Sequence, residues 1–227
     1  MSADLFWLIL TLGIFQTGLF YYEKRNKPML LQPIFVTYIA VLTLLMLTGT
    51  SYTTYFQSTQ LIHFLLAPAT VALALPLYKN FALIRALFVP VMITLVVGST
   101  VSILVAVGLL YLFGASPETM ISMTTKSITA AIAAVTSKQI GAIPSLAIGF
   151  VILTGMTGAV FGTLVLKLAN IKHDEAKGFA LGIISHGIGT ARAVEISEKA
   201  GAFSALAMGL GGILVSILLP VVIALLD

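Results

Sequence analysis

The residues best suited to bind an anion lie at positions 185–192, where the run SHGIGTAR interrupts an otherwise apolar stretch. Gly187 and Gly189 disfavour a continuous helix, and Thr190 can cap a new helix that begins after them. The first turn of such a helix presents unpaired N–H groups and the positive end of its dipole, which attract a carboxylate. The sequence therefore predicts a break with a backbone anion site. A cytoplasmic loop with a glycine turn is the alternative interpretation.

The side chains around this break allow both a binding and a purely structural interpretation. Ser185 contributes a hydroxyl. Arg192 could hold a carboxylate with its two-pronged guanidinium, or pair with Glu195 three residues later on the same helix face. His186 could exchange a proton near neutral pH and couple it to the anion, with Glu195 as a second proton site. His186 could also be a hydrogen-bonded packing residue.

A second stretch of polar residues surrounds Lys126, whose neighbours include several hydroxyl side chains. An ammonium deep in a membrane is costly, which makes Lys126 a functional candidate, although its side chain could instead reach the surface. Ser127 and Thr129 could coordinate an anion or bond back to the preceding turn. We expect this stretch to face residues 185–192 near the middle of the membrane, so that both bind one anion.

The sequence lacks the motifs of metal binding, hydrolysis and nucleotide binding. The histidines have no metal-ligand spacing, the chain has no cysteine, and no Ser, His and acid form a hydrolase signature. Neither a G-x-G-x-x-G fingerprint nor a P-loop occurs. We therefore expect no enzyme, no metal and no cofactor.

The composition indicates that these residues are positioned by helices in lipid. Of the 227 residues, 59% are hydrophobic and 9% are charged, and the mean hydropathy is +1.10. Soluble domains have about 25% charged residues. At 1.5 Å per residue, a helical chain of this length has room for about six to eight crossings of a ~30 Å hydrocarbon layer once loops are included. A soluble enzyme, a nucleic-acid-binding protein and a disulfide scaffold are excluded, and a single all-α membrane domain over residues 1–227 is predicted.

Six apolar runs are each long enough to span the membrane. They cover residues 5–22, 33–49, 61–78, 87–113, 143–166 and 203–226. The basic residues that follow the first run place its far end in the cytoplasm and the N-terminus outside. Two less apolar stretches, 119–141 and 178–200, either cross as well or dip in and return. Dipping would leave the basic connection 167–177 in the cytoplasm, as the distribution of Lys and Arg slightly favours.

Two weaker patterns bear on how the helices pack. Residues 70–74 echo residues 129–133 at an offset of 59, which suggests an internal repeat with a second interruption at Pro68 and Thr70, although Thr and Ala recur in any packed membrane helix. Glycines four apart, at 158 and 162 and at 178 and 182, favour close approach of helices.

The chain resembles the CidB/LrgB family of membrane proteins over essentially its whole length. The match rests on SHGIGTARA at 185–193, KSIT at 126–129, QIGAIPSL at 139–146, FVILTG at 150–155, APATVALA at 67–74 and PLYK at 76–79. The sequence departs from the family pattern at Ala131, where many members have proline, and at Lys138, where an acid is frequent. The first departure puts a proline-made break near residue 130 in doubt.

The resemblance implies a multi-pass protein of the bacterial inner membrane that works with a small four-helix partner of the CidA/LrgA type, and we expect it to form an oligomer. Family members are described as holin-like or antiholin-like regulators of murein hydrolase activity and cell lysis. Others look like carriers of small monocarboxylates, namely pyruvate, glycolate or glycerate. From both lines we expect a monocarboxylate transporter, with the regulator as the alternative.

Overall fold

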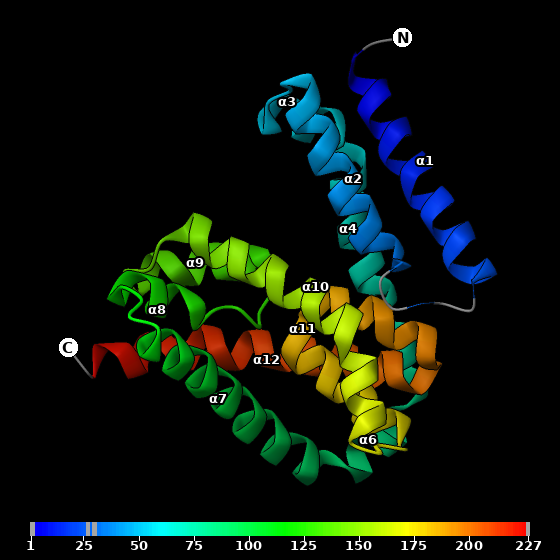
Figure 1. Cartoon of the computed structure of the whole chain (residues 1–227). Helices are drawn as coiled ribbons and strands as arrows, with labels where there is room; N and C mark the ends of the chain where they lie inside the picture. The colour runs from blue at the N-terminus through cyan, green and yellow to red at the C-terminus, as the bar shows by residue number, and fades with distance from the viewer. Residues whose placement is uncertain (1–2, 26–27, 29–30, 226–227) are drawn as a thin grey trace. The chain divides into compact units, whose positions relative to one another are not determined.

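The computed structural model describes residues 3–25, 28 and 31–225. Within these residues the chain is all-helical, which confirms the predicted fold class at that level. The helices (Figure 1) are α1 (Ala3–Lys24), α2 (Pro33–Thr48), α3 (Tyr52–Ser58), α4 (Gln60–Ala72), α5 (Ala74–Lys79), α6 (Phe81–Ala86), α7 (Phe88–Leu112), α8 (Pro117–Met123), α9 (Ala130–Gln139), α10 (Pro144–Leu168), α11 (Asp174–Ile196) and α12 (Glu198–Ala224). They form two compact units, Met1–Ala72 and Leu73–Asp227. The single membrane domain stays a prediction.

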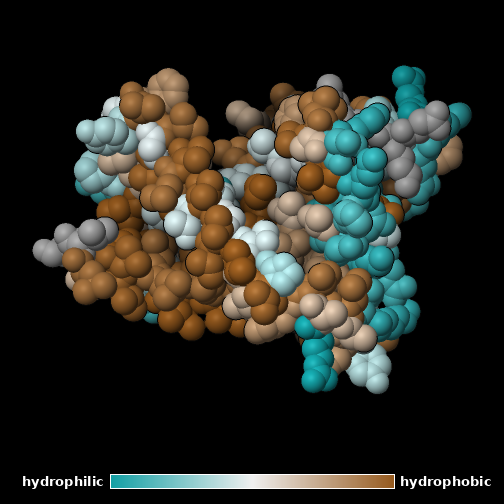
Figure 2. Space-filling model, turned by 90° about the horizontal axis from the view of Figure 1, so that it is seen from below, coloured by the Kyte–Doolittle hydropathy of each residue, from teal (hydrophilic) through white to brown (hydrophobic). Residues whose placement is uncertain are grey.

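Helices of membrane-spanning length and composition match the predicted apolar runs. Among the described residues, five are long and apolar enough to cross, and the shorter α2 is also apolar. The five are Leu5–Lys24, Gln60–Lys79, Phe88–Leu112, Pro144–Leu168 and Glu198–Ala224. Apolar side chains cover most of the surface seen in Figure 2. The chain is therefore a multi-pass membrane protein.

The first unit is a small helical assembly in which α1 packs against α2 and α3. The buried ring of Trp7 meets the ring of Tyr55 edge to face, with 5.8 Å between the ring centroids. The predicted interruption at Pro68 and Thr70 is wrong, because α4 continues through both residues and the Thr70 hydroxyl donates to the carbonyl of Leu66 at 2.8 Å. The helix instead ends at Ala72, before a turn.

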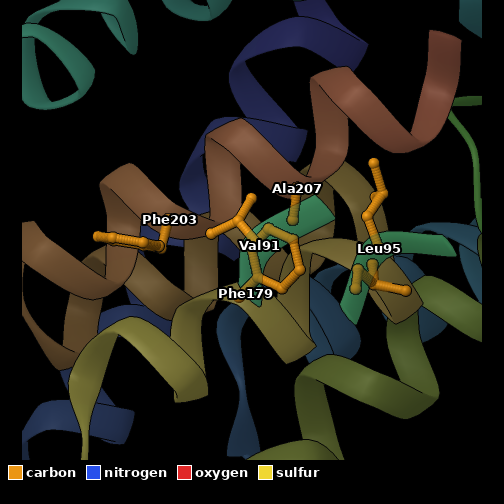
Figure 3. Packing of buried hydrophobic residues seen from close by; sticks show 6 residues of the cluster. Val91, Leu95, Phe179, Phe203 and Ala207 are labelled. Carbon is orange, nitrogen blue, oxygen red and sulfur yellow. The ribbon is translucent and has the colours of Figure 1, made fainter. Parts of the chain in front are cut away.

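The second unit has its core where α7, α11 and α12 meet. Figure 3 shows this cluster: Val91 and Leu95 come from α7, Phe179 from α11, and Phe203 and Ala207 from α12. In lipid, such helices associate through packing rather than through removal of apolar surface from water. Close fit along these helices is therefore what holds the unit together.

Within this unit α11 is a helical hairpin and not a rod. At His186 the backbone has φ 40° and ψ −127°, and the chain turns back on itself. Gly189 then lies against the carbonyl of Leu181, eight residues earlier, which a straight helix would hold about 12 Å away. Farther from the turn, Ala193 packs in one cluster with Leu181. We call residues 174–185 the first arm and residues 187–196 the second arm.

Both ends of this hairpin lie at one polar end of the unit. The Asp174 carboxylate, where the first arm begins, accepts hydrogen bonds from Lys177 and from Ser197, just after the second arm. These hydrogen bonds hold the pKa of Asp174 below its usual value. Further ion pairs at this end are Lys199–Glu175 at 3.8 Å and Lys79–Glu198 at 2.8 Å. The hairpin therefore returns to the end from which it started.

Glycines set the distance between the first arm and its neighbours. A Cβ at Gly158 or Gly162 of α10 would collide with side chains of the first arm. On the other face of the arm, a Cβ at Gly178 or Gly182 would collide with the backbone of α12. The prediction that these glycine pairs allow close approach of helices is confirmed.

Candidate functional site

The stretch around Lys126 is interrupted, as predicted. The helix α8 ends at Met123, α9 begins at Ala130, and residues 124–129 between them are not helical. Thr129 is the N-cap of α9, since its hydroxyl accepts a hydrogen bond from the N–H of Ile132 at 3.4 Å. The break forms without a proline at Ala131, because Thr129 supplies the cap that starts the new helix.

Lys126 is a buried cation in the middle of this break. Its residue is 6% exposed, and its Nζ donates to the hydroxyls of Ser102 at 2.7 Å and Ser127 at 3.0 Å. Ser102 lies near the middle of α7, so the ammonium sits at mid-helix depth and does not reach a helix end. Among the described residues no carboxylate lies within ion-pair distance of Lys126. Such a charge favours an anion beside it.

The turn of the α11 hairpin is held by hydrogen bonds. The buried His186 ring bonds through Nε2 to the carbonyl of Val151 at 3.0 Å, and because a carbonyl only accepts, Nε2 carries the proton. The Thr190 hydroxyl donates to the carbonyl of His186 at 2.8 Å and accepts from the hydroxyl of Ser204 at 2.9 Å. The predicted break is therefore present, but it is centred on His186.

Two details of the sequence prediction are wrong at this turn. Thr190 does not cap a new helix, since its hydroxyl bonds back to the preceding turn. Gly187 and Gly189 are both helical, and the residue of α11 with positive φ is His186. Gly189 serves the close approach of the arms, whereas Gly187 is exposed, and a Cβ there would meet the Met208 sulfur at an ordinary contact distance of 3.8 Å. The glycines thus permit the chain to reverse, but they do not form the extended stretch of backbone that was expected to bind an anion.

The break around Lys126 and the turn at His186 meet on α10. Val151, whose carbonyl accepts from His186, packs in one cluster with Ile128 of the break. Lys126 and Ser185 line the same cavity of about 550 Å³ between α10 and the first arm. The Ser185 hydroxyl is buried and has no hydrogen-bond partner in the part of the chain that the structure describes. In these residues the break around Lys126 and the turn of the hairpin therefore lie against the same helix, α10, and that they form one substrate site stays a prediction.

A second cavity reaches Lys126 from the other side of the first arm. Its volume is about 810 Å³, and it is lined by α7, by the first arm and by Ser102. Both cavities are lined mainly by apolar side chains. The sequence did not single out Ser102, or Thr154 and Thr157 in the first cavity, because single hydroxyls within long apolar runs carry no distinctive signal. Lys126 therefore lines both of these largely apolar cavities, and its ammonium brings a positive charge to them.

Arg192 lines neither of the two cavities that Lys126 lines. It lines a third cavity, of about 370 Å³, together with Lys167 and Lys177, and it pairs with Glu195. The expectation that Arg192 and Lys126 surround one anion is therefore wrong, because the hairpin carries the second arm back toward its base. Glu195 accompanies Arg192 rather than the ring of His186. Direct contact of Arg192 with the substrate stays a prediction.

The model of the LrgB-like family matches residues 11–225. The chain belongs to the LrgB-like family. This confirms the resemblance inferred from the motifs.

Relatives of the LrgB-like chain align over nearly their full length. Holin-like protein CidB of Staphylococcus epidermidis is 31% identical over 218 residues, which cover 96% of this chain and 95% of the relative. Holin-like protein CidB of Staphylococcus aureus is 30% identical over 211 residues, 91% of this chain and 92% of the relative. Protein YxaC of Bacillus subtilis is 33% identical over 216 residues, 95% and 94% of the two chains. No solved structure matches.

Proposed function

We propose that this chain is a holin-like membrane protein that takes part in controlling murein hydrolase activity and cell lysis. The observation that carries this proposal is the alignment with holin-like CidB proteins over more than nine tenths of both chains. A small membrane partner of the CidA/LrgA type, implied by the family resemblance, would act with it in the bacterial inner membrane.

Expression in a bacterium that lacks its own family members tests this role. The chain, with and without the partner, is expected to change the rate of lysis and the activity of murein hydrolases in cell-wall extracts. If lysis and hydrolase activity stay at the level of the empty vector in both strains, the regulatory proposal fails.

One structural observation favours a second function, the transport of a small monocarboxylate such as pyruvate, glycolate or glycerate. It is the buried ammonium of Lys126, which has hydroxyl partners but no carboxylate partner among the described residues. A carboxylate in the adjoining cavity would neutralise this charge, and the hydroxyls of Ser127 and Ser185 would orient it. His186 would carry the coupled proton on Nδ1, since its Nε2 proton is held by Val151.

The membrane arrangement that supports transport has six crossing helices and two segments that enter and return. Residues 117–139 would enter from outside and the α11 hairpin from the cytoplasm, so that their turns meet near the middle. The polar base of the hairpin supports this arrangement, because it leaves the basic connection 167–177 in the cytoplasm. Assembly into an oligomer is part of this proposal.

Uptake by liposomes that contain the purified chain tests the carrier. Labelled pyruvate or glycolate should enter saturably, and Lys126→Gln should abolish uptake because Lys126 is the only charged residue among the described ones that line the cavity. Lys138→Gln is the matched control, since Lys138 is exposed on α9 and lines neither cavity. Equal uptake by Lys126→Gln and the parent chain would refute the role of Lys126, absence of saturable uptake by the parent chain would refute the carrier, and leakage of unrelated solutes of similar size would indicate a pore.

A further inference from the structure

The third cavity of the second unit is distinct from the site around Lys126. It has a volume of about 370 Å³ and lies between the end of α10, the connection to α11, and both arms of the hairpin. Three cations line it: Lys167 from α10, Lys177 from the first arm and Arg192 from the second arm. Asn170 and Thr163 add an amide and a hydroxyl. Its lining contains no acid among the described residues.

The charges around this cavity are only partly balanced. Lys177 pairs with Asp174 at 2.8 Å, and Arg192 pairs with Glu195. No carboxylate of the described chain lies within ion-pair distance of Lys167. Three cations and two acids therefore leave one positive charge at the cavity, where the Arg192 side chain is 15% exposed.

The donors come from more directions than a carboxylate can use. Two lysines from different helices, an arginine, an asparagine and a threonine line one small volume, whereas a carboxylate offers two oxygens in one plane. A phosphate offers three or four oxygens in a tetrahedral arrangement, and arginine binds two of them at once. We propose that this cavity binds a phosphate group.

The apolar part of the lining indicates where such a phosphate comes from. Leu166, Ile171 and Ile196 share the cavity with the cations. A site that is cationic on one side and apolar on the other fits the headgroup and glycerol region of an anionic phospholipid. Its place at the polar base of the hairpin is where such a headgroup lies when the arms are in the membrane. A free phosphate offers the same chemistry without the apolar part.

Native mass spectrometry of the purified full-length chain tests the site. The chain is mixed with phosphatidylglycerol or with phosphatidylcholine of the same acyl chains, and a separate sample receives labelled orthophosphate in equilibrium dialysis. Phosphatidylglycerol is expected to bind in preference to phosphatidylcholine. Lys167→Gln should lower this binding about fivefold, the loss expected for one cation at the membrane surface, and Arg192→Lys should lower it although the charge is kept.

Lys172→Gln is the matched control, because Lys172 is an exposed cation of the same connection that does not line the cavity. Binding of orthophosphate alone would assign the site to a free phosphate, and binding of phosphatidylglycerol would assign it to a lipid. If Lys172→Gln lowers binding as much as Lys167→Gln, or if neither ligand binds, the proposal is overturned. None of these results depends on transport, so failure here leaves the function proposed for the Lys126 site unaffected.

Discussion

At the scale of single residues, glycines determine the packing inside the second unit as much as the larger residues do. The His186 ring lies against α10 because Gly155 has no Cβ, and an added Cβ would lie 2.8 Å from the ring carbon Cε1. Its hydrogen bond to Val151 depends on that approach. Gly155 is therefore a positioning residue for the turn of the hairpin.

Gly155→Ala is predicted to destabilise the protein by about 1–3 kcal/mol, as overpacking of a filled core does. Gly149→Ala on the same helix is the control, because nothing lies within 4 Å of a Cβ there. In that variant the change should be neutral or slightly stabilising, since alanine is the better helix former. Thermal unfolding in detergent measures both. Equal melting temperatures for the two variants would contradict the packing of His186 on α10.

Asp174 makes the base of the hairpin sensitive to acid. Hydrogen bonding from Lys177 and Ser197 lowers its pKa in the folded protein, so its contribution to stability is complete above the usual value of 3.8 and is lost as the pH falls through the lower folded value. The melting temperature of Asp174→Asn should therefore be lower than that of the parent chain at pH 7. The two melting temperatures should approach each other as the pH falls below about 4. A constant difference at all pH values would argue against this role of the carboxylate.

At the scale of elements, the reversal of α11 is the feature on which the site depends. A straight helix over the same residues would hold Leu181 and Ala193 about 18 Å apart. In the hairpin both belong to one packed cluster. The reversal also brings Ser185 and His186 to the middle of α10 and returns Arg192 toward the base.

Cysteine pairs in this cysteine-free chain test the reversal. Leu181→Cys with Ala193→Cys should cross-link rapidly with a short bifunctional reagent. Ala147→Cys with Ala159→Cys is the matched control, because these two buried positions have the same spacing within the unbroken α10 and should not cross-link. Cross-linking of the control alone, or of neither pair, would show that α11 is not folded as a hairpin.

At the scale of the whole molecule, the number of crossings is tied to the side on which the basic connection lies. A single cysteine at Lys172 should react with a membrane-impermeant reagent from the cytoplasm, because a hairpin that returns leaves this connection where α12 begins. Labelling of inside-out and right-side-out vesicles distinguishes the two sides. Reaction from outside would instead support eight crossings.

The sequence by itself determined the class of the protein and two of the places where its helices break, around Lys126 and within residues 185–192. A 59% hydrophobic composition with few charges requires helices in lipid, and the hydroxyl-rich stretch around Lys126 and the glycine-containing stretch around His186 cannot form unbroken apolar helices. The family also follows from the sequence, since its motifs are contiguous runs of residues. Each of these properties is local in the chain.

Only the tertiary structure decided which polar residues share a site. The expectation that two interrupted segments meet in the membrane placed Arg192 beside Lys126, but the backbone reverses at His186 and carries Arg192 to a separate cavity. Ser102 contacts Lys126 from a helix 24 residues away, and nothing in its own segment predicts that contact. The direction of a chain after a break depends on which packing surfaces the two arms find, here the glycine faces of α10 and of α11 itself. Such surfaces exist only once the helices have come together.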